Sequence, residues 1–271
     1  MNKTIDAGDF NRILNKYLAN INAEFLERWN LLVPTIEDKE FIEVIIGLLS
    51  RQISITHYYL SSPNTWNGDI GTIILRSICE NVINISWILK DDSINRARMF
   101  IVYGLGQEKL QLEHRKNEMN NGEVSEEEIQ MVEYMENSLN QEKYTFLTDV
   151  NIGSWSDKSI LKIAEEADCL DFYHLAFTPF SNSAHGTWNH LIKYSLRKSS
   201  NPLHNLLRRP IFYNLEPDIT FAELAMKYLS KSLRKFDNYF NQKIVSKDSY
   251  EIYLEDLENL LINKDDNNTS Q

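Results

Sequence analysis

Apolar residues recur every three or four positions along most of this chain, which is the spacing of one face of an α-helix. The pattern predicts helices over about 10–32, 41–59, 70–89, 93–120, 125–142, 156–164, 219–241 and 248–262. A further helix is predicted to begin with Thr178 as its cap and Pro179 in its first turn. Residues 61–69 and 198–217 lack the spacing and are predicted to be irregular. The polar stretch 263–271 is predicted to be disordered.

The chain has few residues that interrupt helices, with nine Gly and six Pro in 271 residues. No internal repeat and no linker divides it. We therefore expect an all-α fold, a single multi-helix bundle of about eight to nine helices, with one domain over 1–262, its core at about 35–240, and the tail 263–271 outside it. Helix 70–89 is apolar around most of its circumference, which predicts that it is central and contacts the helix that begins at Thr178.

Several classes of protein are disfavoured by the sequence. Cys79 and Cys169 lie far apart, so neither a disulfide framework nor a thiolate zinc site is expected. The N-terminal residues lack the apolar region of a signal peptide, and no apolar run reaches the eighteen or so residues of a membrane helix. We therefore expect a cytoplasmic protein without membrane contact. No glycine-rich nucleotide loop is present, and the histidine spacing does not suit a metal. We expect no metal and no cofactor.

Charge is distributed unevenly along the chain. The formal net charge is −11, yet residues 172–215 contain no Asp or Glu. This segment holds four of the six histidines and five candidate anion-binding cations, Lys193, Arg197, Lys198, Arg208 and Arg209. It is predicted to meet RNA or a small anionic ligand. The acidic stretch 118–142 is most simply a solvated helical flank.

Two pairs of polar residues at helical spacing are candidates for a site. Arg76 and Glu80 lie on one face of helix 70–89, where they predict a partly buried ion pair. Ser181 and His185 repeat this spacing, and Ser181 could orient the imidazole of His185 as a general acid or base. The alternative for His185 is a hydrogen-bonded histidine of the core. A nucleophilic serine is poorly supported, because no acidic residue of the segment completes a triad.

Two blocks of the sequence carry a resemblance to a known family. The first is Leu75-Arg76-Ser77-Ile78-Cys79-Glu80-Asn81 with Trp87-Ile88-Leu89, and the second is Tyr173 with Phe180-Ser181-Asn182-Ser183-Ala184-His185-Gly186. In order and separation they resemble a family of helical bacterial proteins, domain of unknown function 5677, over about 35–240. The resemblance implies an all-helical fold and no established activity.

A more distant resemblance is to the HEPN superfamily of helical bundles, many of which are metal-independent ribonucleases of toxin and antiphage systems. Ser181 and His185 match the polar and histidine positions of its motif, whereas Phe180 stands where the motif has Arg. A cation would have to come from elsewhere, such as Arg76, Arg197 or Arg208.

Three functions follow from these observations. The first is a binding or sensing module of a defence or toxin system, in which Arg76, Glu80, Ser181 and His185 form a buried polar network beside the basic segment. The alternative is a HEPN-like metal-independent ribonuclease that acts as a defence or toxin effector, with these four residues as its catalytic set. The third is a structural helical protein. A homodimer or a partner protein is compatible with all three.

Overall fold

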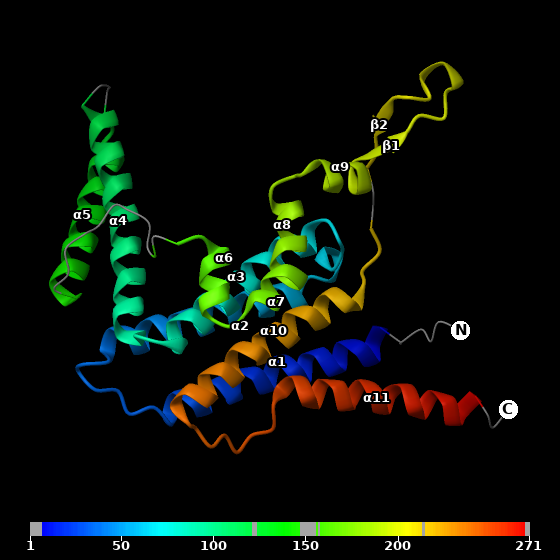
Figure 1. Cartoon of the computed structure of the whole chain (residues 1–271), viewed down its shortest axis with the longest axis horizontal. Helices are drawn as coiled ribbons and strands as arrows, with labels where there is room; N and C mark the ends of the chain where they lie inside the picture. The colour runs from blue at the N-terminus through cyan, green and yellow to red at the C-terminus, as the bar shows by residue number, and fades with distance from the viewer. Residues whose placement is uncertain (1–6, 121–123, 147–155, 157, 213–214, 269–271) are drawn as a thin grey trace.

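Helices make up most of the computed structural model, which describes residues 7–120, 124–146, 156, 158–212 and 215–268 (Figure 1). The helices are α1 (Ala7–Asn30), α2 (Lys39–Leu60), α3 (Ile70–Lys90), α4 (Ser93–Met119), α5 (Glu126–Phe146), α6 (Ile160–Glu166), α7 (Leu170–Phe172), α8 (Thr178–Ala184), α9 (Trp188–Tyr194), α10 (Ile219–Phe240) and α11 (Ser249–Asn268). Two short strands, β1 (Leu196–Lys198) and β2 (Arg208–Pro210), pair antiparallel. The predicted all-helical class is confirmed.

Helix α3 lies at the centre of the molecule. It contacts α2, α4, α6, α8 and α10, and its side chains Leu75, Ile78, Val82 and Ile88 are fully buried. By length and composition α3 is long and apolar enough to cross a membrane, contrary to the expectation from its sequence, but 72% of its most apolar window is buried inside the protein. Burial on this scale is typical of a core helix. The predicted contact between α3 and the helix that contains Thr178 is present.

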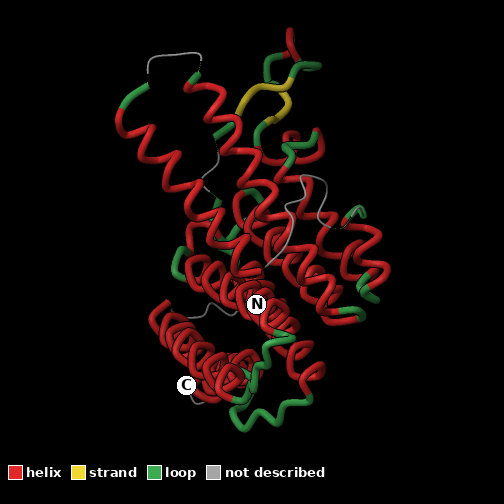
Figure 2. The backbone as a smooth tube through the Cα atoms, turned by 90° about the vertical axis from the view of Figure 1, so that its left-hand side faces the viewer, coloured by secondary structure: helices red, strands yellow, loops and turns green. Residues whose placement is uncertain are grey.

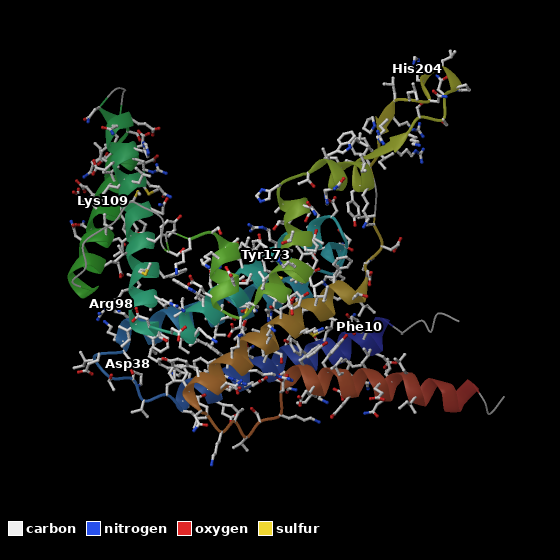
Figure 3. The ribbon with its side chains drawn as sticks, viewed as in Figure 1. Phe10, Asp38, Arg98, Lys109, Tyr173 and His204 are labelled. Carbon is white, nitrogen blue, oxygen red and sulfur yellow. The ribbon has the colours of Figure 1, made fainter. Side chains whose placement is uncertain are left out.

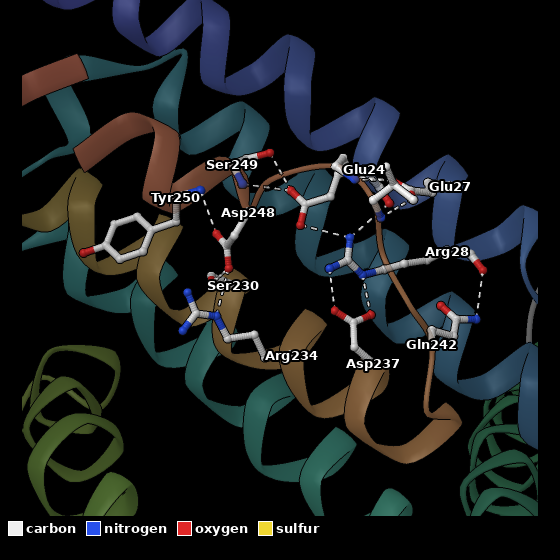
Figure 4. A network of polar contacts seen from close by, with 12 residues as sticks. Glu24, Glu27, Arg28, Ser230, Arg234, Asp237, Gln242, Asp248, Ser249 and Tyr250 are labelled. Carbon is white, nitrogen blue, oxygen red and sulfur yellow. Dashed lines mark hydrogen bonds and ion pairs between the residues drawn. The ribbon is translucent and has the colours of Figure 1, made fainter. Parts of the chain in front are cut away.

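A layer of three helices closes the side of the core where both chain ends lie (Figure 1). Helices α1 and α11 pack side by side, and α10 contacts α11, α2 and α3. A buried ionic cluster joins the three helices (Figure 4). Arg28 donates two hydrogen bonds to Asp237, of 2.7 and 2.6 Å, and lies 2.9 Å from Glu24. Glu24 in turn accepts hydrogen bonds from the backbone N–H and the hydroxyl of Ser249.

Two arms project from the same side of this body (Figures 1 and 2). The acidic hairpin consists of α4 and α5, which pack against each other around a small apolar cluster of their own, Leu105, Leu112, Val132 and Leu139. A reciprocal capping box starts α5: the Ser125 N–H donates to the Glu128 carboxylate at 2.9 Å, and the Glu128 N–H donates to the Ser125 hydroxyl at 3.3 Å. This box was predicted. The other projection is the basic arm, residues 188–212, which comprises α9, β1, β2 and the turn between the strands.

The helix start predicted at Thr178 is wrong. Helical backbone begins eight residues earlier, at Leu170, and passes through a π-helical turn at Tyr173–Phe177 directly into α8. Thr178 and the residue before it, Phe177, both have helical backbone angles, so neither is a cap of the expected kind. Pro179 cannot donate a backbone hydrogen bond. The wider π-helical turn before it changes the hydrogen-bond pattern at the same place.

Three further expectations need correction. Residues 198–217 are only partly irregular, because the strand pair continues the chain after α9. The helix expected from 156 begins at Ile160 as α6, and its cap is Ser159, whose hydroxyl accepts from the Lys162 N–H at 3.2 Å. Helix α11 extends to Asn268, so the stretch expected to be disordered from 263 is helical to that residue, and 269–271 lie outside the described residues. Adding a residue to an existing helix needs no new nucleus, so even polar residues can extend it.

Candidate functional site

Arg76 is the centre of a polar cluster between α3 and α8. Its Nη1 lies 2.9 Å from Glu80 Oε2, and its Nε donates to Ser181 Oγ at 3.2 Å. The guanidinium also lies over the ring of Phe177, 4.8 Å from the ring centroid. The side chains of Arg76 and Glu80 are 25% and 41% exposed. The predicted pair therefore forms, Ser181 joins it, and the cluster keeps access to solvent.

His185 does not join this cluster. Helix α8 ends at Ala184, and His185 is its C-cap, followed by Gly186 with a positive φ of 55°. The side chain of His185 is exposed. Within the described part of the chain it makes no hydrogen bond and no ion pair. Its exposure excludes the core-histidine interpretation. The four-residue spacing from Ser181 assumed a helix that continues past His185, whereas the helix ends there.

A different histidine is held in place by the fold. His190 Nε2 lies 2.7 Å from Asp69 Oδ1, with the His190 side chain 9% exposed. The two residues are 121 positions apart in the chain, so no local pattern could have predicted this contact. Beside it, a Cβ atom added to Gly68 would lie 1.9 Å from the hydroxyl oxygen of Tyr194, so a larger residue at this position would displace the Tyr194 side chain. Both contacts attach α9 to the loop before α3.

These contacts border a pocket of about 340 Å³ between α3, α8, α9 and α10. Its wall combines aromatic rings, amides, hydroxyls and one cation, with the lining residues Gly68, Thr72, Pro179, Phe180, Asn182, Ser183, Asn189, His190, Lys193, Tyr194 and Phe221. The floor is fixed by a buried hydrogen bond of 2.6 Å from the Thr72 hydroxyl to the Ser183 hydroxyl. Of the five cations singled out in the sequence, Lys193 lines this pocket.

The other four cations lie on the strands of the basic arm. Arg197 stands opposite Arg209 and Lys198 opposite Arg208 in the antiparallel register. All four are exposed, and none forms an ion pair with a described carboxylate. The Arg208 guanidinium lies 5.4 Å from the ring centroid of Trp188, which is 58% exposed. His204 marks the far tip of the arm (Figure 3).

A second cavity, of about 520 Å³, lies apart from these residues between α2, α4 and α5. Gly47 and Gly104 line it, together with the single cation Arg51 and three carboxylates, those of Glu43, Glu108 and Glu142. Its charge does not suit the anion that the basic segment was predicted to bind. We therefore place the candidate site at α3, α8, α9 and the arm.

The cysteines and the other residue types that bind metals were each located in the structure. The described residues contain no group of three or more His, Cys, Asp or Glu that could hold a metal ion. Cys79 and Cys169 are free and buried. Burial raises the pKa of the Cys79 thiol, an effect that nearby Arg76 only partly offsets. The Cys79 thiol therefore stays protonated and is a poor nucleophile.

The site and the fold together define an all-helical domain with a projecting basic arm. This chain belongs to a family of unknown function (DUF5677), whose model matches residues 42–202, more than half of the chain. The match includes the Arg76 cluster, His190 and strand β1, and it ends within the arm before Arg208. No curated protein and no solved structure matches the chain.

Proposed function

We propose that this protein is a binding module that holds single-stranded RNA on its basic arm. The observation that carries the proposal is the register of the arm, in which Arg197 faces Arg209 and Lys198 faces Arg208. Like charges directly opposite each other destabilise a strand pair. An anion bound along the strands removes this repulsion, so the arrangement suits a ligand with regularly spaced negative charges, such as a phosphate backbone.

The arm also carries aromatic surface suited to bases. Trp188 and Phe212, at its two ends in sequence, are 58% and 98% exposed. Proteins that bind single strands combine a cationic path along the backbone with aromatic rings on which bases stack. The four strand residues provide the cations, one opposed pair on each face of the strand pair because neighbouring strand residues point to opposite faces. Trp188 and Phe212 provide the stacking surface.

The negative charge of the rest of the protein favours RNA binding at the arm. The chain as a whole carries a net charge of −11, and the acidic hairpin projects on the same side of the body as the basic arm (Figure 1). A polyanion is repelled by the hairpin and attracted by the acid-free segment 172–215. Binding through about four phosphate contacts gives a slope of about −3 for the logarithm of the affinity against the logarithm of the salt concentration.

The test is a titration of a fluorescently labelled single-stranded RNA, followed by anisotropy at several salt concentrations. Replacement of Arg197, Lys198, Arg208 and Arg209 by Glu should abolish binding. The matched control replaces four exposed lysines of α10 and the loop after it, Lys227, Lys231, Lys243 and Lys247, by Glu. This control has the same net charge and should retain binding. Equal behaviour of the two variants, or a wild-type protein that does not bind, would rule the proposal out.

A second candidate function is a HEPN-like metal-independent ribonuclease in a defence or toxin system. The observation that favours it is the 3.2 Å contact of Arg76 Nε with Ser181 Oγ, which places a cation beside the residue that matches the polar position of the superfamily motif. His185, exposed to solvent, would transfer the proton. His185→Ala should then lower the rate of RNA cleavage in EDTA by about 10²–10⁴-fold.

The matched control for this second function is His174→Ala, which removes another exposed histidine of the same segment. It should leave the cleavage rate unchanged. RNA that stays intact with the wild-type protein, or is cut equally by both variants, eliminates the ribonuclease and leaves RNA binding unaffected as a separate question.

A further inference from the structure

The pocket between α3, α8, α9 and α10 has the wall chemistry that recognises a nucleobase. Phe180, Tyr194 and Phe221 supply flat aromatic surface, and Asn182 and Asn189 supply amides. Unpaired bases in RNA are bound in this way, stacked on aromatic side chains and hydrogen-bonded along their edges. Its volume of about 340 Å³ lies at the small end of the range for ligand pockets. A single base with its sugar suits that size.

The side-chain amides of Asn182 and Asn189 have donors or acceptors that no described residue occupies. Asn182 Oδ1 accepts from the Thr187 hydroxyl at 3.2 Å, which leaves the Asn182 amino group as a donor. Asn189 is exposed, and its side chain has no hydrogen bond to any residue that the structure describes. Amide side chains present a donor and an acceptor together, so they can distinguish one base edge from another.

A cation stands beside the amides. Lys193 lines the same pocket, its Nζ lies 5.0 Å from the centroid of the Tyr194 ring, and it has no described carboxylate partner. A phosphate attached to a bound nucleotide can therefore meet Lys193. The pocket thus combines the groups that recognise a base with one that attracts its phosphate.

The pocket is formed before any ligand arrives. His190 and Asp69 fix α9 to the start of α3, and Gly68 allows the Tyr194 hydroxyl to approach the backbone. The buried Thr72 to Ser183 hydrogen bond fixes α8 to α3 on the other side. A preformed pocket spends little free energy on ordering its side chains when a ligand binds.

The pocket is continuous with the arm. Lys193 and Tyr194 end α9, and β1 begins two residues later with Leu196. An RNA strand that lies on β1 and β2 and continues towards α9 therefore reaches the pocket. We propose that the pocket takes one unstacked base of the strand that the arm holds, and that Asn182 and Asn189 select which base. This inference rests on the proposed RNA-binding function of the arm.

The experiment compares four labelled RNA homopolymers, of A, C, G and U, with an abasic ribose-phosphate polymer of the same length. The wild-type protein should bind at least one homopolymer about 10-fold or more tightly than the weakest one. The double variant Asn182→Leu with Asn189→Leu should lose this preference and bind the abasic polymer as well as the wild type does. The matched control, Asn238→Leu with Asn259→Leu, replaces two exposed amides elsewhere and should keep the preference.

The outcomes separate the pocket from the arm. If the pocket variant ranks the four homopolymers by affinity as the wild type does, or if the wild type binds all four equally, the pocket does not select a base, although the arm still binds RNA. If the wild type binds neither the homopolymers nor the abasic polymer, the arm proposal fails. Free nucleoside monophosphates, titrated by NMR, then test the pocket alone, and no shift of the Asn182 or Asn189 amide signals overturns it.

Discussion

Two Arg–Glu pairs in this protein have the same helical spacing and different surroundings. Glu24 and Arg28 on α1, and Arg76 and Glu80 on α3, are each four residues apart, and each pair has a nitrogen to oxygen distance of 2.9 Å. The side chains of Arg28 and Glu24 are 3% and 2% exposed, against 25% and 41% for Arg76 and Glu80. The same spacing and the same distance, with the order of Arg and Glu along the helix reversed, thus accompany a buried cluster in one case and a partly exposed cluster in the other.

The remaining partners explain the difference. Arg28 also binds the carboxylate of Asp237 from α10, so two negative groups surround it in the interior. Among the described residues beyond its own helix, Arg76 contacts the neutral hydroxyl of Ser181 and the ring of Phe177. The sealed cluster joins α1, α10 and α11, which lie outside the range matched by the family model, and the open cluster lies within it. A buried ion cluster holds helices together, whereas a partly exposed one remains accessible to a ligand.

The largest effect is expected from Arg28→Ala. It leaves Glu24 and Asp237 buried without their counter-charge, which should lower the free energy of unfolding by about 3–5 kcal/mol. Urea denaturation followed by circular dichroism measures it, with Arg12→Ala as a control on the exposed face of the same helix. A loss below about 1 kcal/mol would show that the cluster is not sealed in solution.

An intermediate effect concerns the dependence of stability on pH. The carboxyls of Glu24 and Asp248 should change the free energy of unfolding in opposite directions as the pH changes. Burial raises the pKa of Glu24, with the hydrogen bonds from Ser249 and the charge of Arg28 acting against it. A folded state with a raised carboxyl pKa binds more protons than the unfolded state, so this contribution to stability falls as the pH rises above about 4.5. Burial also raises the pKa of Asp248, but hydrogen bonds from Ser230 and Arg234 outweigh it, and the net pKa is lowered. Its contribution is full above about pH 4 and is lost in more acidic solution.

The pH effect is measured as urea midpoints from about pH 3 to 8. Relative to Glu24→Gln, the wild type should gain stability as the pH falls towards 4.5. Relative to Asp248→Asn, it should lose its advantage below about pH 4. Parallel curves for the two variants would contradict the opposite environments of these carboxyls.

A smaller effect is expected from Glu80→Ala. The pair with Arg76 is partly solvated, so its loss should lower the free energy of unfolding by about 0.3–1 kcal/mol. The measurement is the same urea titration, with Glu43→Ala, in the exposed pair with Lys39, as a comparison. A loss of 3 kcal/mol or more would mean that Arg76 is as sealed as Arg28, and it would remove the contrast between the two clusters.

The smallest effect is expected from His185→Ala, within about 0.5 kcal/mol of the wild type, because the side chain is exposed and lacks partners among the described residues. A thermal unfolding scan measures it. His190→Ala is the informative comparison, since it removes the contact with Asp69 and should lower the melting temperature further. A protein that unfolds on substitution of His185 would restore the core-histidine interpretation.

The sequence predicted what depends on neighbours along the chain. The spacing of apolar residues identified the central helix α3, and the Ser125 and Glu128 pattern identified a capping box that the structure contains. It missed the helix start at Leu170, because Pro179 is a typical first-turn residue and a π-helical turn has no clear sequence signal. It also missed the strand pair, because three-residue strands are too short to show alternation.

For the candidate site, the sequence by itself determined that Arg76 can reach Glu80, since i,i+4 residues meet on any helix. It also determined that residues 172–215 carry cations without acid. Only the tertiary structure decided that the Arg28 side chain is buried and the Arg76 side chain is partly exposed. It also decided that His190, and not His185, contacts a carboxylate. The pairing of the two strands decided that like charges face each other across the arm. The reason is physical: burial and long-range pairing depend on which distant segments pack together, and the same local spacing is compatible with either result.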